Sequence, residues 1–115
     1  MSYEWVGSSL GETVEELKDR LFMEFLDMLI LRVLARGRPL GGYDIIALVR
    51  REFGVPVSAG TIRSMLHSME RAGTLQIALE GERKKVFYLT DKGKEFVKAV
   101  LGNRQEILDL VSKLL

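Results

Sequence analysis

The chain has 115 residues, of which 47% are hydrophobic and 29% are charged, a composition typical of one folded domain with its own core. No apolar run reaches the roughly 18–20 residues that a membrane-spanning helix needs, and the N-terminus lacks the features of a signal peptide. The absence of cysteine excludes disulfides, thiol catalysis and thiolate metal sites. We therefore expect a cytoplasmic protein without a membrane segment.

The charges are unevenly distributed, although the net charge is only +1. Residues 1–30 carry seven acidic and two basic residues, whereas residues 31–115 carry nine acidic and fifteen basic ones. This asymmetry indicates a body that faces an anionic partner and an acidic N-terminal element that is turned elsewhere.

The N-terminal third predicts an irregular start followed by one long helix. Residues 1–11 mix aromatic residues with Gly and Ser. Thr13, followed three residues later by Glu16, resembles a capping box and predicts the start of the helix. Residues 22–36 are apolar on nearly all sides, which requires burial on more than one side. In so small a domain, we expect the spare face to contact a second copy of the chain.

The glycine-rich stretch 37–42 ends this helix. Residues 43–53 predict a second helix, and Gly54 is its expected C-terminal stop. The side chains expected to point inward are Ile45, Ile46, Val49 and Phe53. Tyr43 is either a core aromatic residue or a phosphate contact at the helix start, and we expect core packing.

Residues 58–71 predict the helix around which the rest of the chain is organised. Ser58 is a suitable N-cap, and an apolar stripe follows at helical spacing: Ile62, Met65, Leu66 and Met69. The opposite face carries small, hydroxyl and basic residues, with no acidic residue before Glu70. Such a face can enter a major groove and donate hydrogen bonds to phosphates and bases. An ordinary amphipathic surface helix is the alternative interpretation.

After Gly73 the hydrophobic period changes from helical spacing to alternation. Residues 75–80 and 86–90 predict two strands, joined at Gly81-Glu82, with Leu75, Ile77, Leu79, Phe87 and Leu89 inward. Three basic residues follow the turn: Arg83, Lys84 and Lys85. They suit contact with a DNA backbone, and a solvated turn is the alternative.

The last third predicts two further helices. One begins after Thr90 and packs through Phe96, Val97, Val100 and Leu101; the other covers residues 105–115 beyond the interruption at Gly102-Asn103. The order of elements predicts a mainly α fold with a small β-hairpin, a winged helix with extra N- and C-terminal helices for dimerisation. We expect residues 1–22 and 102–115 to form dimer contacts, and residues 23–101 to form the winged-helix DNA-binding domain.

Several segments resemble the PadR-like family of winged-helix transcriptional regulators, over about residues 23–100. They are Leu26–Leu34, Pro39–Ile45, Ser58–Ile62, Leu66–Gly73 and Arg83–Gly93. The more specific features are Gly42-Tyr43 at a helix entry, the Ser58–Thr61 cap and the strand end Tyr88-Leu89-Thr90, in this order and spacing.

The chain departs from this family pattern at three places. Arg63-Ser64 stands where the family usually has Tyr-Pro, Gly41-Gly42 where it often has His-Gly, and Val86-Phe87 where it usually has paired tyrosines. These departures affect the DNA sequence preference more than the fold, because Arg63 can address a phosphate or a guanine edge.

The resemblance implies a homodimeric, sequence-specific DNA-binding regulator, with double-stranded DNA and a second copy of the chain as partners. A repressor is the expected type, and a small-molecule effector of unknown identity is possible. The expected DNA contacts in the helix are Ser58, Ala59, Thr61, Arg63, Ser64, His67 and Arg71, and those in the wing (residues 81–86) are Arg83, Lys84 and Lys85. A winged helix that serves only as a protein–protein interaction module is the alternative.

The sequence predicts neither a catalytic site nor a metal or cofactor site. His67 is the only histidine, and a pair with Ser64 or Ser68 would lack the orienting acid and the oxyanion hole of a triad. One histidine and scattered carboxylates have no metal-ligand spacing. Trp5, Phe22 and Phe25 could line an effector pocket at a dimer interface, but a role in the core is the simpler interpretation.

Overall fold

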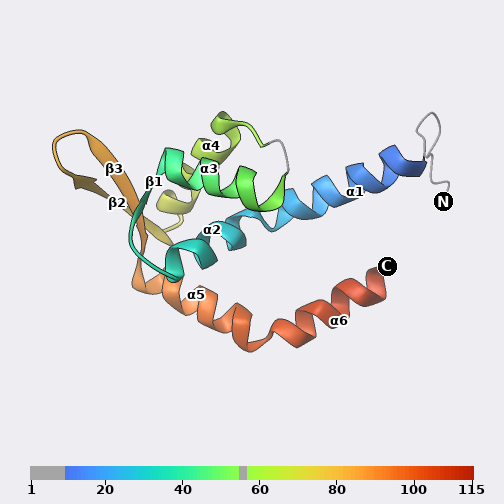
Figure 1. Ribbon diagram of the computed structural model, residues 1–115. Coiled ribbons are helices and arrows are strands. Elements are labelled where there is room, and N and C mark those ends of the chain that lie inside the picture. Colours follow the sequence, from blue (N-terminus) through green and yellow to red (C-terminus); the bar gives the residue numbers. More distant parts are fainter. Residues whose placement is uncertain (1–9, 55–56) are drawn as a thin grey trace.

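The computed structural model describes residues 10–54 and 57–115, and Figure 1 shows a small antiparallel sheet at one end of a mainly helical body. The elements are α1 (Leu10–Glu24), α2 (Leu26–Ala35), β1 (Leu40–Gly41), α3 (Gly42–Phe53), α4 (Ala59–Arg71), β2 (Leu75–Glu80), β3 (Lys84–Leu89), α5 (Asp91–Gly102) and α6 (Arg104–Leu114). The predicted mainly helical winged-helix architecture is confirmed. The expectations for residues 1–9, including Trp5, and for residues 55–56 lie outside the described residues.

The core is built around α2, whose side chains are apolar on nearly all sides. Leu26, Ile30, Leu31 and Leu34 are all at most 5% exposed. They belong to one cluster with buried residues of the other elements: Ile45, Ile46, Val49, Val57, Ile62, Leu66, Met69, Leu75, Phe87, Leu89 and Val97. Full burial of a side chain of this size stabilises the fold by about 1.5–3 kcal/mol. The predicted burial of this segment on several sides is therefore confirmed.

The helix that was expected to begin at Thr13 and continue to Arg36 is divided at Phe25. α1 begins at Leu10, so Thr13 lies inside a helix and the predicted capping box is wrong. Phe25 has φ −102° and ψ 5°, and its amide donates to the carbonyls of both Leu21 and Phe22 at 3.2 Å. This tightened turn ends α1, so that α2 is buried in the core whereas α1 lies outside it.

The sheet contains a third strand that the sequence did not predict. Central β3 pairs with β2 from Leu75↔Leu89 to Glu80↔Lys84, and on its other side with β1 through Leu40↔Phe87 and Gly41↔Val86. A two-residue strand has no detectable period, which explains why it was missed. Its consequence is that α3 begins immediately beside the first residues of β3.

The far end of the hairpin extends beyond the helices, as Figure 1 shows. Leu79 was expected to point inward, but it is 66% exposed because the core ends before this part of the hairpin. The other expected inward residues of the two strands, Leu75, Phe87 and Leu89, are buried, and Ile77 is half-buried.

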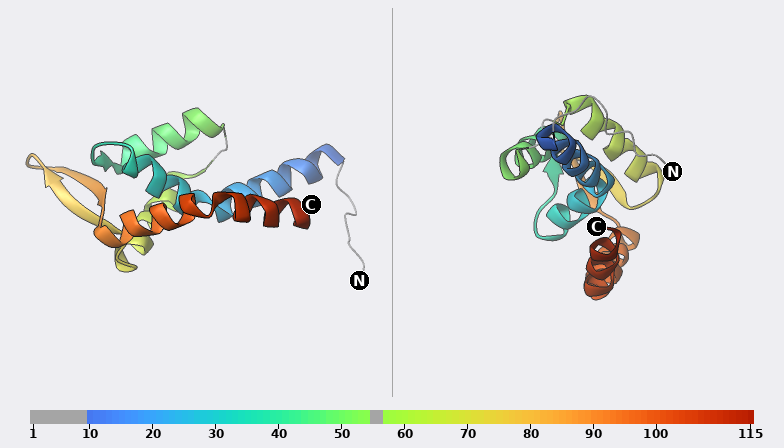
Figure 2. Two further views of the ribbon diagram at one scale, coloured as in Figure 1. Left: turned by 90° about the horizontal axis from the view of Figure 1, so that it is seen from below. Right: turned by 90° about the vertical axis from the view of Figure 1, so that its right-hand side faces the viewer.

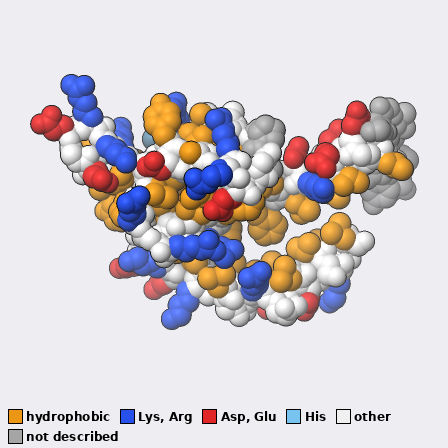
Figure 3. Space-filling model, in the orientation of Figure 1, with side chains coloured by type: hydrophobic (Ala, Val, Ile, Leu, Met, Phe, Trp, Pro, Cys, Tyr) orange, Lys and Arg blue, Asp and Glu red, His pale blue; other side chains and the backbone are white. Residues whose placement is uncertain are grey.

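The terminal helices α1 and α6 project from the same side of the body (Figures 1 and 2). The radius of gyration is 16.5 Å, compared with about 13 Å for a compact domain of this length. Within the described part of the chain, neither helix contains a buried residue. Figure 3 shows hydrophobic side chains on the sides of α1 and α6 that face each other across a gap.

The start of α5 is anchored by Thr90 and by close backbone packing at Gly93. The hydroxyl of Thr90 accepts a hydrogen bond from the Gly93 amide at 3.1 Å, and the Thr90 amide donates to the Thr74 carbonyl at 3.1 Å. A Cβ atom on Gly93 would lie 2.3 Å from that Thr74 oxygen, so the position admits only glycine without a backbone shift.

We predict that Gly93→Ala destabilises the protein by about 2–4 kcal/mol, because the added methyl group collides with the backbone of Thr74. Urea unfolding followed by circular dichroism, at one fixed protein concentration, measures the change. Gly102→Ala is the matched control, because it lies in the same helix with nothing within 4 Å of an added Cβ. Equal unfolding midpoints for the two variants would contradict the close approach.

Candidate nucleic-acid interface

α4 is positioned by its cap and by one buried stripe. Ser58 has extended backbone angles, and its hydroxyl oxygen accepts a hydrogen bond from the Thr61 amide at 3.1 Å. Ile62, Leu66 and Met69 are buried, at 0%, 1% and 7% exposure. The predicted N-cap and apolar stripe are therefore confirmed, and the rotation of the helix leaves its small, hydroxyl and basic residues exposed.

A groove of about 690 Å³ runs between α4, the N-terminus of α3 and the first residues of β3. Its apolar floor includes Leu66 and Phe87. Five of the residues predicted to contact DNA line it together: Arg63, His67, Arg83, Lys84 and Lys85. They come from positions about twenty residues apart in the chain. The tertiary fold brings them together, because α3 packs against α4 while β1, directly before α3, pairs with β3.

Positive charge predominates in this groove. Four of its lining residues are Arg or Lys, and the one carboxylate among them belongs to Asp44, which pairs with Lys84 at 3.4 Å. Figure 3 shows Lys and Arg side chains over the hairpin and the neighbouring helices, with some acidic side chains on the hairpin, while further acidic side chains lie on α1 at the opposite end. The acidic N-terminal element that the sequence indicated thus lies at the opposite end from the groove.

The other flank of α4 carries the remaining predicted contacts. Ser58, Thr61, Ser64 and Arg71 border a shallow depression there, beside Gly60. Ala59, also predicted to contact DNA, is half-buried and packs against the core. The exposed face of α4 therefore has a basic flank next to the wing and a flank rich in small and hydroxyl groups away from it.

Among the groove residues that were not predicted contacts, Tyr43 and Asp44 carry the polar side chains, and both lie in the first turn of α3. Tyr43 was expected in the core, which is wrong, because the residue is 76% exposed. Its hydroxyl accepts a hydrogen bond from Nη2 of Arg63 at 3.0 Å. Asp44 accepts one from the Gly41 amide at 3.1 Å in addition to its ion pair with Lys84. The sequence signal was an aromatic and an acidic residue directly after two glycines.

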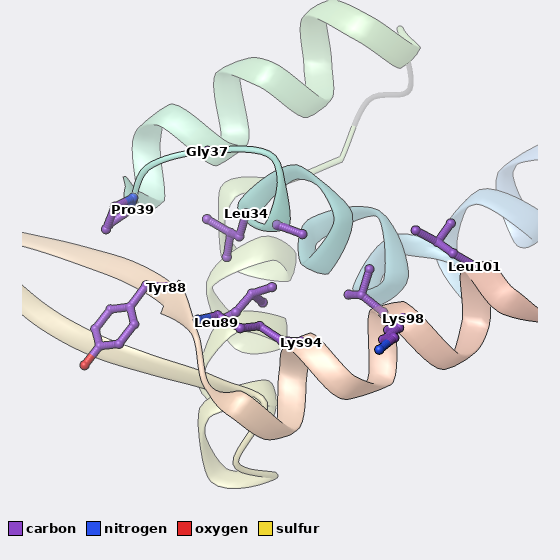
Figure 4. Close-up of a pocket in the computed structure, with 10 residues that line it drawn as sticks. Leu34, Gly37, Pro39, Tyr88, Leu89, Lys94, Lys98 and Leu101 are labelled. Atoms are coloured by element: carbon purple, nitrogen blue, oxygen red, sulfur yellow. The ribbon is translucent and has the colours of Figure 1, made fainter.

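A second cavity, of about 520 Å³, lies between α2, β3 and α5 (Figure 4). Its wall is mainly apolar and includes Leu34, Leu89 and Leu101, while Lys94 and Lys98 are its charged residues. None of the predicted DNA contacts lines it.

Of the aromatic residues expected in the core or at an effector pocket, Phe22 and Phe25 are among the described residues. Phe25 is 46% exposed because it lies at the turn between α1 and α2, so the expected core role is wrong for it. Phe22 is half-buried, and its ring lies 5.5 Å from that of Phe53, which agrees with the expected packing role. Phe53 itself, expected to point inward, is 44% exposed.

Two further features are absent from residues 10–54 and 57–115. No cluster of three or more His, Asp or Glu side chains there could hold a metal ion. No helix in these ranges is long and apolar enough to cross a membrane.

The core helices α2, α3 and α4, with a basic groove between α4 and the β-hairpin, define a winged-helix protein of the nucleic-acid-binding type. The sequence profile described as "Transcriptional regulator PadR-like family" matches residues 30–99, which is more than half of the chain. The chain therefore belongs to the PadR-like family of transcriptional regulators, which are DNA-binding proteins and not enzymes. The matched range lies within the predicted domain 23–101, whose boundaries stay a prediction.

Solved structures of PadR-like regulators share this fold. A PadR family transcriptional regulator from Eggerthella lenta is 25% identical, with a TM-score of 0.73, over 90% of this chain and 93% of that one. A PadR-like regulator from Bacillus cereus is 21% identical, with a TM-score of 0.72, over 83% of this chain and 95% of that one. Among curated proteins, no match was found.

A third solved structure is that of Bacillus subtilis PadR in complex with operator DNA. It is 29% identical to this chain, with a TM-score of 0.57, over 69% of this chain and 48% of that one. The assignment of the family and the fold therefore does not depend on how the groove is interpreted.

We predict that Ser58→Ala destabilises the protein by about 1 kcal/mol, because an orphan amide in the first turn of α4 loses its side-chain acceptor. The midpoint of urea unfolding measures this loss. Ser64→Ala is the matched control on the exposed face of the same helix, and we expect its effect to stay within about 0.5 kcal/mol. A loss as large in the control as in Ser58→Ala would show that the cap is not the cause.

Proposed function

We propose that this protein is a homodimeric, sequence-specific DNA-binding repressor that acts in the cytoplasm by occupying a promoter. The observation that carries the proposal is the convergence of Arg63, Arg83, Lys84 and Lys85 on one groove beside the exposed face of α4. That face has no acidic residue that would repel phosphate before Glu70. The complex of Bacillus subtilis PadR with operator DNA supports DNA as the partner.

In this proposal α4 enters the major groove and the wing contacts the adjacent backbone or minor groove. The N-terminal half of a recognition helix faces the base edges, which assigns Arg63 and Ser64 to the bases or nearby phosphates. His67 lies one turn beyond Arg63 on the same exposed face and is assigned to the same contact surface. Ser58 and Thr61 at the cap, and Arg71 at the far end, are assigned to the backbone, because hydroxyl and basic groups donate to phosphate oxygens. Arg83, Lys84 and Lys85 supply the electrostatic contacts of the wing.

The apolar faces of α1 and α6 support the homodimer. Exposed hydrophobic residues lie along both helices. They include Leu10, Val14 and Leu21 on α1, and Leu108 and Leu114 on α6. Two contiguous apolar faces across an open gap suit the same two helices of a second copy, since a closed two-fold dimer buries the same surface on both protomers. Two copies of α4 would then read two half-sites about 34–36 Å apart.

The alternative of a protein–protein interaction module without specific DNA binding is not favoured. Membership of a family of transcriptional regulators and the excess of positive charge in the groove both point to DNA. A small-molecule effector, which the family resemblance allows, is tested by none of these observations.

The DNA-binding proposal predicts that the affinity for DNA falls steeply as the salt concentration rises, because the groove cations contact phosphates. We expect the triple variant Arg63→Ala, Lys84→Ala, Lys85→Ala to lose most of its affinity for generic duplex DNA. The slope of log K against log salt concentration should fall by about two to three, since each lost phosphate contact removes about one unit. Fluorescence anisotropy titrations at several salt concentrations measure both quantities.

The matched control removes three cations outside the groove, by Lys94→Ala, Lys98→Ala and Lys113→Ala. Its salt slope is expected to stay close to that of the wild type. Equal losses in the two triple variants would mean that only the net charge matters. A wild type that binds no duplex DNA even at low salt would end the DNA-binding proposal.

The dimer proposal predicts dissociation when charge is placed on the terminal helices. We expect the double variant Val14→Lys, Leu114→Lys to raise the dimer dissociation constant by about a hundredfold or more. Each substitution removes about 1–2 kcal/mol of stabilisation from apolar burial and adds a charge that must be desolvated. Sedimentation velocity over a concentration series measures this change. Leu79→Lys, which alters a similarly exposed leucine on the hairpin, is the control and should leave the dimer intact.

A further inference from the structure

We propose that Tyr43 is a positioning residue that holds Arg63 in the orientation in which it reads a guanine, and so helps to set the base preference of the DNA site. The inference rests on the proposed function and deepens it. It assigns a role to a residue of α3 that lies outside the recognition helix and outside the wing. The same contact explains why an aromatic residue stands exposed at this point of the fold.

The geometry places two exposed side chains from different helices in direct contact. The guanidinium carbon of Arg63 lies 5.3 Å from the centre of the Tyr43 ring, within the range of a cation–π interaction. Nη2 of Arg63 also donates a hydrogen bond to the Tyr43 hydroxyl at 3.0 Å. Tyr43 is 76% exposed, so burial in the core does not account for its position. Both residues line the groove between α4 and the wing.

The chemistry of the guanidinium explains what this contact achieves. The group is planar and has several N–H donors, of which Tyr43 engages one nitrogen. The remaining donors are free to form the paired hydrogen bonds with O6 and N7 of guanine that are the commonest specific contact of arginine in the major groove. Such a paired contact needs a defined orientation, whereas a contact with phosphate tolerates many. Restraining Arg63 before binding also reduces the entropy that is lost on complex formation.

The position of Arg63 on α4 favours a base over a phosphate. It lies in the N-terminal half of the helix, the part that faces base edges when a recognition helix enters the major groove. Its neighbours on the exposed face, Gly60 and Ser64, are small, and an added Cβ on Gly60 would meet only the Ser58 hydroxyl oxygen within 4 Å. The helix can therefore approach the DNA closely at this point, which a base contact requires.

The test is a double-mutant cycle on a DNA site chosen by the protein. A preferred duplex is first selected from a pool of random duplexes with the wild-type full chain. Wild type, Tyr43→Phe, Tyr43→Ala, Arg63→Ala and the double variant Tyr43→Phe, Arg63→Ala are then titrated with this duplex, with versions in which each G·C pair is replaced by A·T, and with an unrelated duplex. Tyr88→Phe is the matched control, because it removes the same hydroxyl from a tyrosine that lines the other cavity.

We expect Arg63→Ala to lose about ten- to a hundredfold of discrimination at one G·C pair. Tyr43→Phe should lose about three- to tenfold at the same pair, and nothing further in the Arg63→Ala background. The affinity of Tyr43→Phe for the unrelated duplex, and the salt dependence of that affinity, should match those of the wild type. A variant that was merely destabilised would lose affinity for both duplexes. Tyr88→Phe should behave as the wild type does.

Three results would overturn the proposal. Additive losses in the double variant would show that Tyr43 contacts DNA by itself. Discrimination left unchanged by both Tyr43→Phe and Tyr43→Ala would show that Tyr43 does not position Arg63. In both cases the wild type still binds DNA, so the proposed function survives. A wild type that binds no duplex at all removes the proposed function together with this inference.

A measurement on the DNA-free protein tests the contact itself. The δ-methylene protons of Arg63 should have upfield NMR shifts caused by the Tyr43 ring. These shifts should persist in Tyr43→Phe and disappear in Tyr43→Ala. Unshifted resonances in the wild-type protein would refute the contact irrespective of any result with DNA.

Discussion

The structure depends on the burial of α2, a helix with too few polar side chains to remain exposed on any wide face. Such a helix requires partners all around, and α3, α4, β3 and α5 supply buried side chains to the same cluster. The turn at Phe25 allows the acidic α1 to leave the body just before this apolar segment begins. The body can therefore be small and well packed, while the terminal helices stay outside it.

The shortest element has the largest effect on the candidate interface. Pairing of Leu40 and Gly41 with β3 places the N-terminus of α3 directly beside the base of the wing. The first turn of α3 then contacts a cation on each side, because Tyr43 binds Arg63 of α4 and Asp44 pairs with Lys84 of β3. α3 thus acts as a bridge that relates the recognition helix to the wing, in addition to packing in the core.

The division of charge and of apolar surface gives the molecule two chemically different ends. The groove cations gather near the hairpin, whereas the acidic residues and exposed leucines of α1 lie at the opposite end (Figure 3). In the proposed dimer the acidic helices stay away from the DNA phosphates, so self-association and DNA binding do not compete for one surface. The cavity between α2, β3 and α5 belongs to neither end (Figure 4).

The sequence alone determined most of the architecture, because local signals specify local structure. The cap at Ser58, the stop at Gly54 and the alternation in residues 75–80 each depend on a few neighbouring residues and on general stereochemistry. The resemblance to the PadR-like family was visible in the sequence over about residues 23–100, and the family profile matches residues 30–99. The helix break at Phe25 escaped prediction because no Gly or Pro marks it.

Only the tertiary structure decided how distant residues meet. No periodicity reveals that Tyr43 lies beside Arg63, twenty positions away, or that Asp44 lies beside Lys84. Core burial was a reasonable expectation for Tyr43, since an aromatic residue at the start of an amphipathic helix usually packs inward. The pairing of β1 with β3 turned that helix start toward the groove instead. The chain therefore encodes its elements locally, while the surface that would meet DNA arises from contacts between elements far apart in sequence.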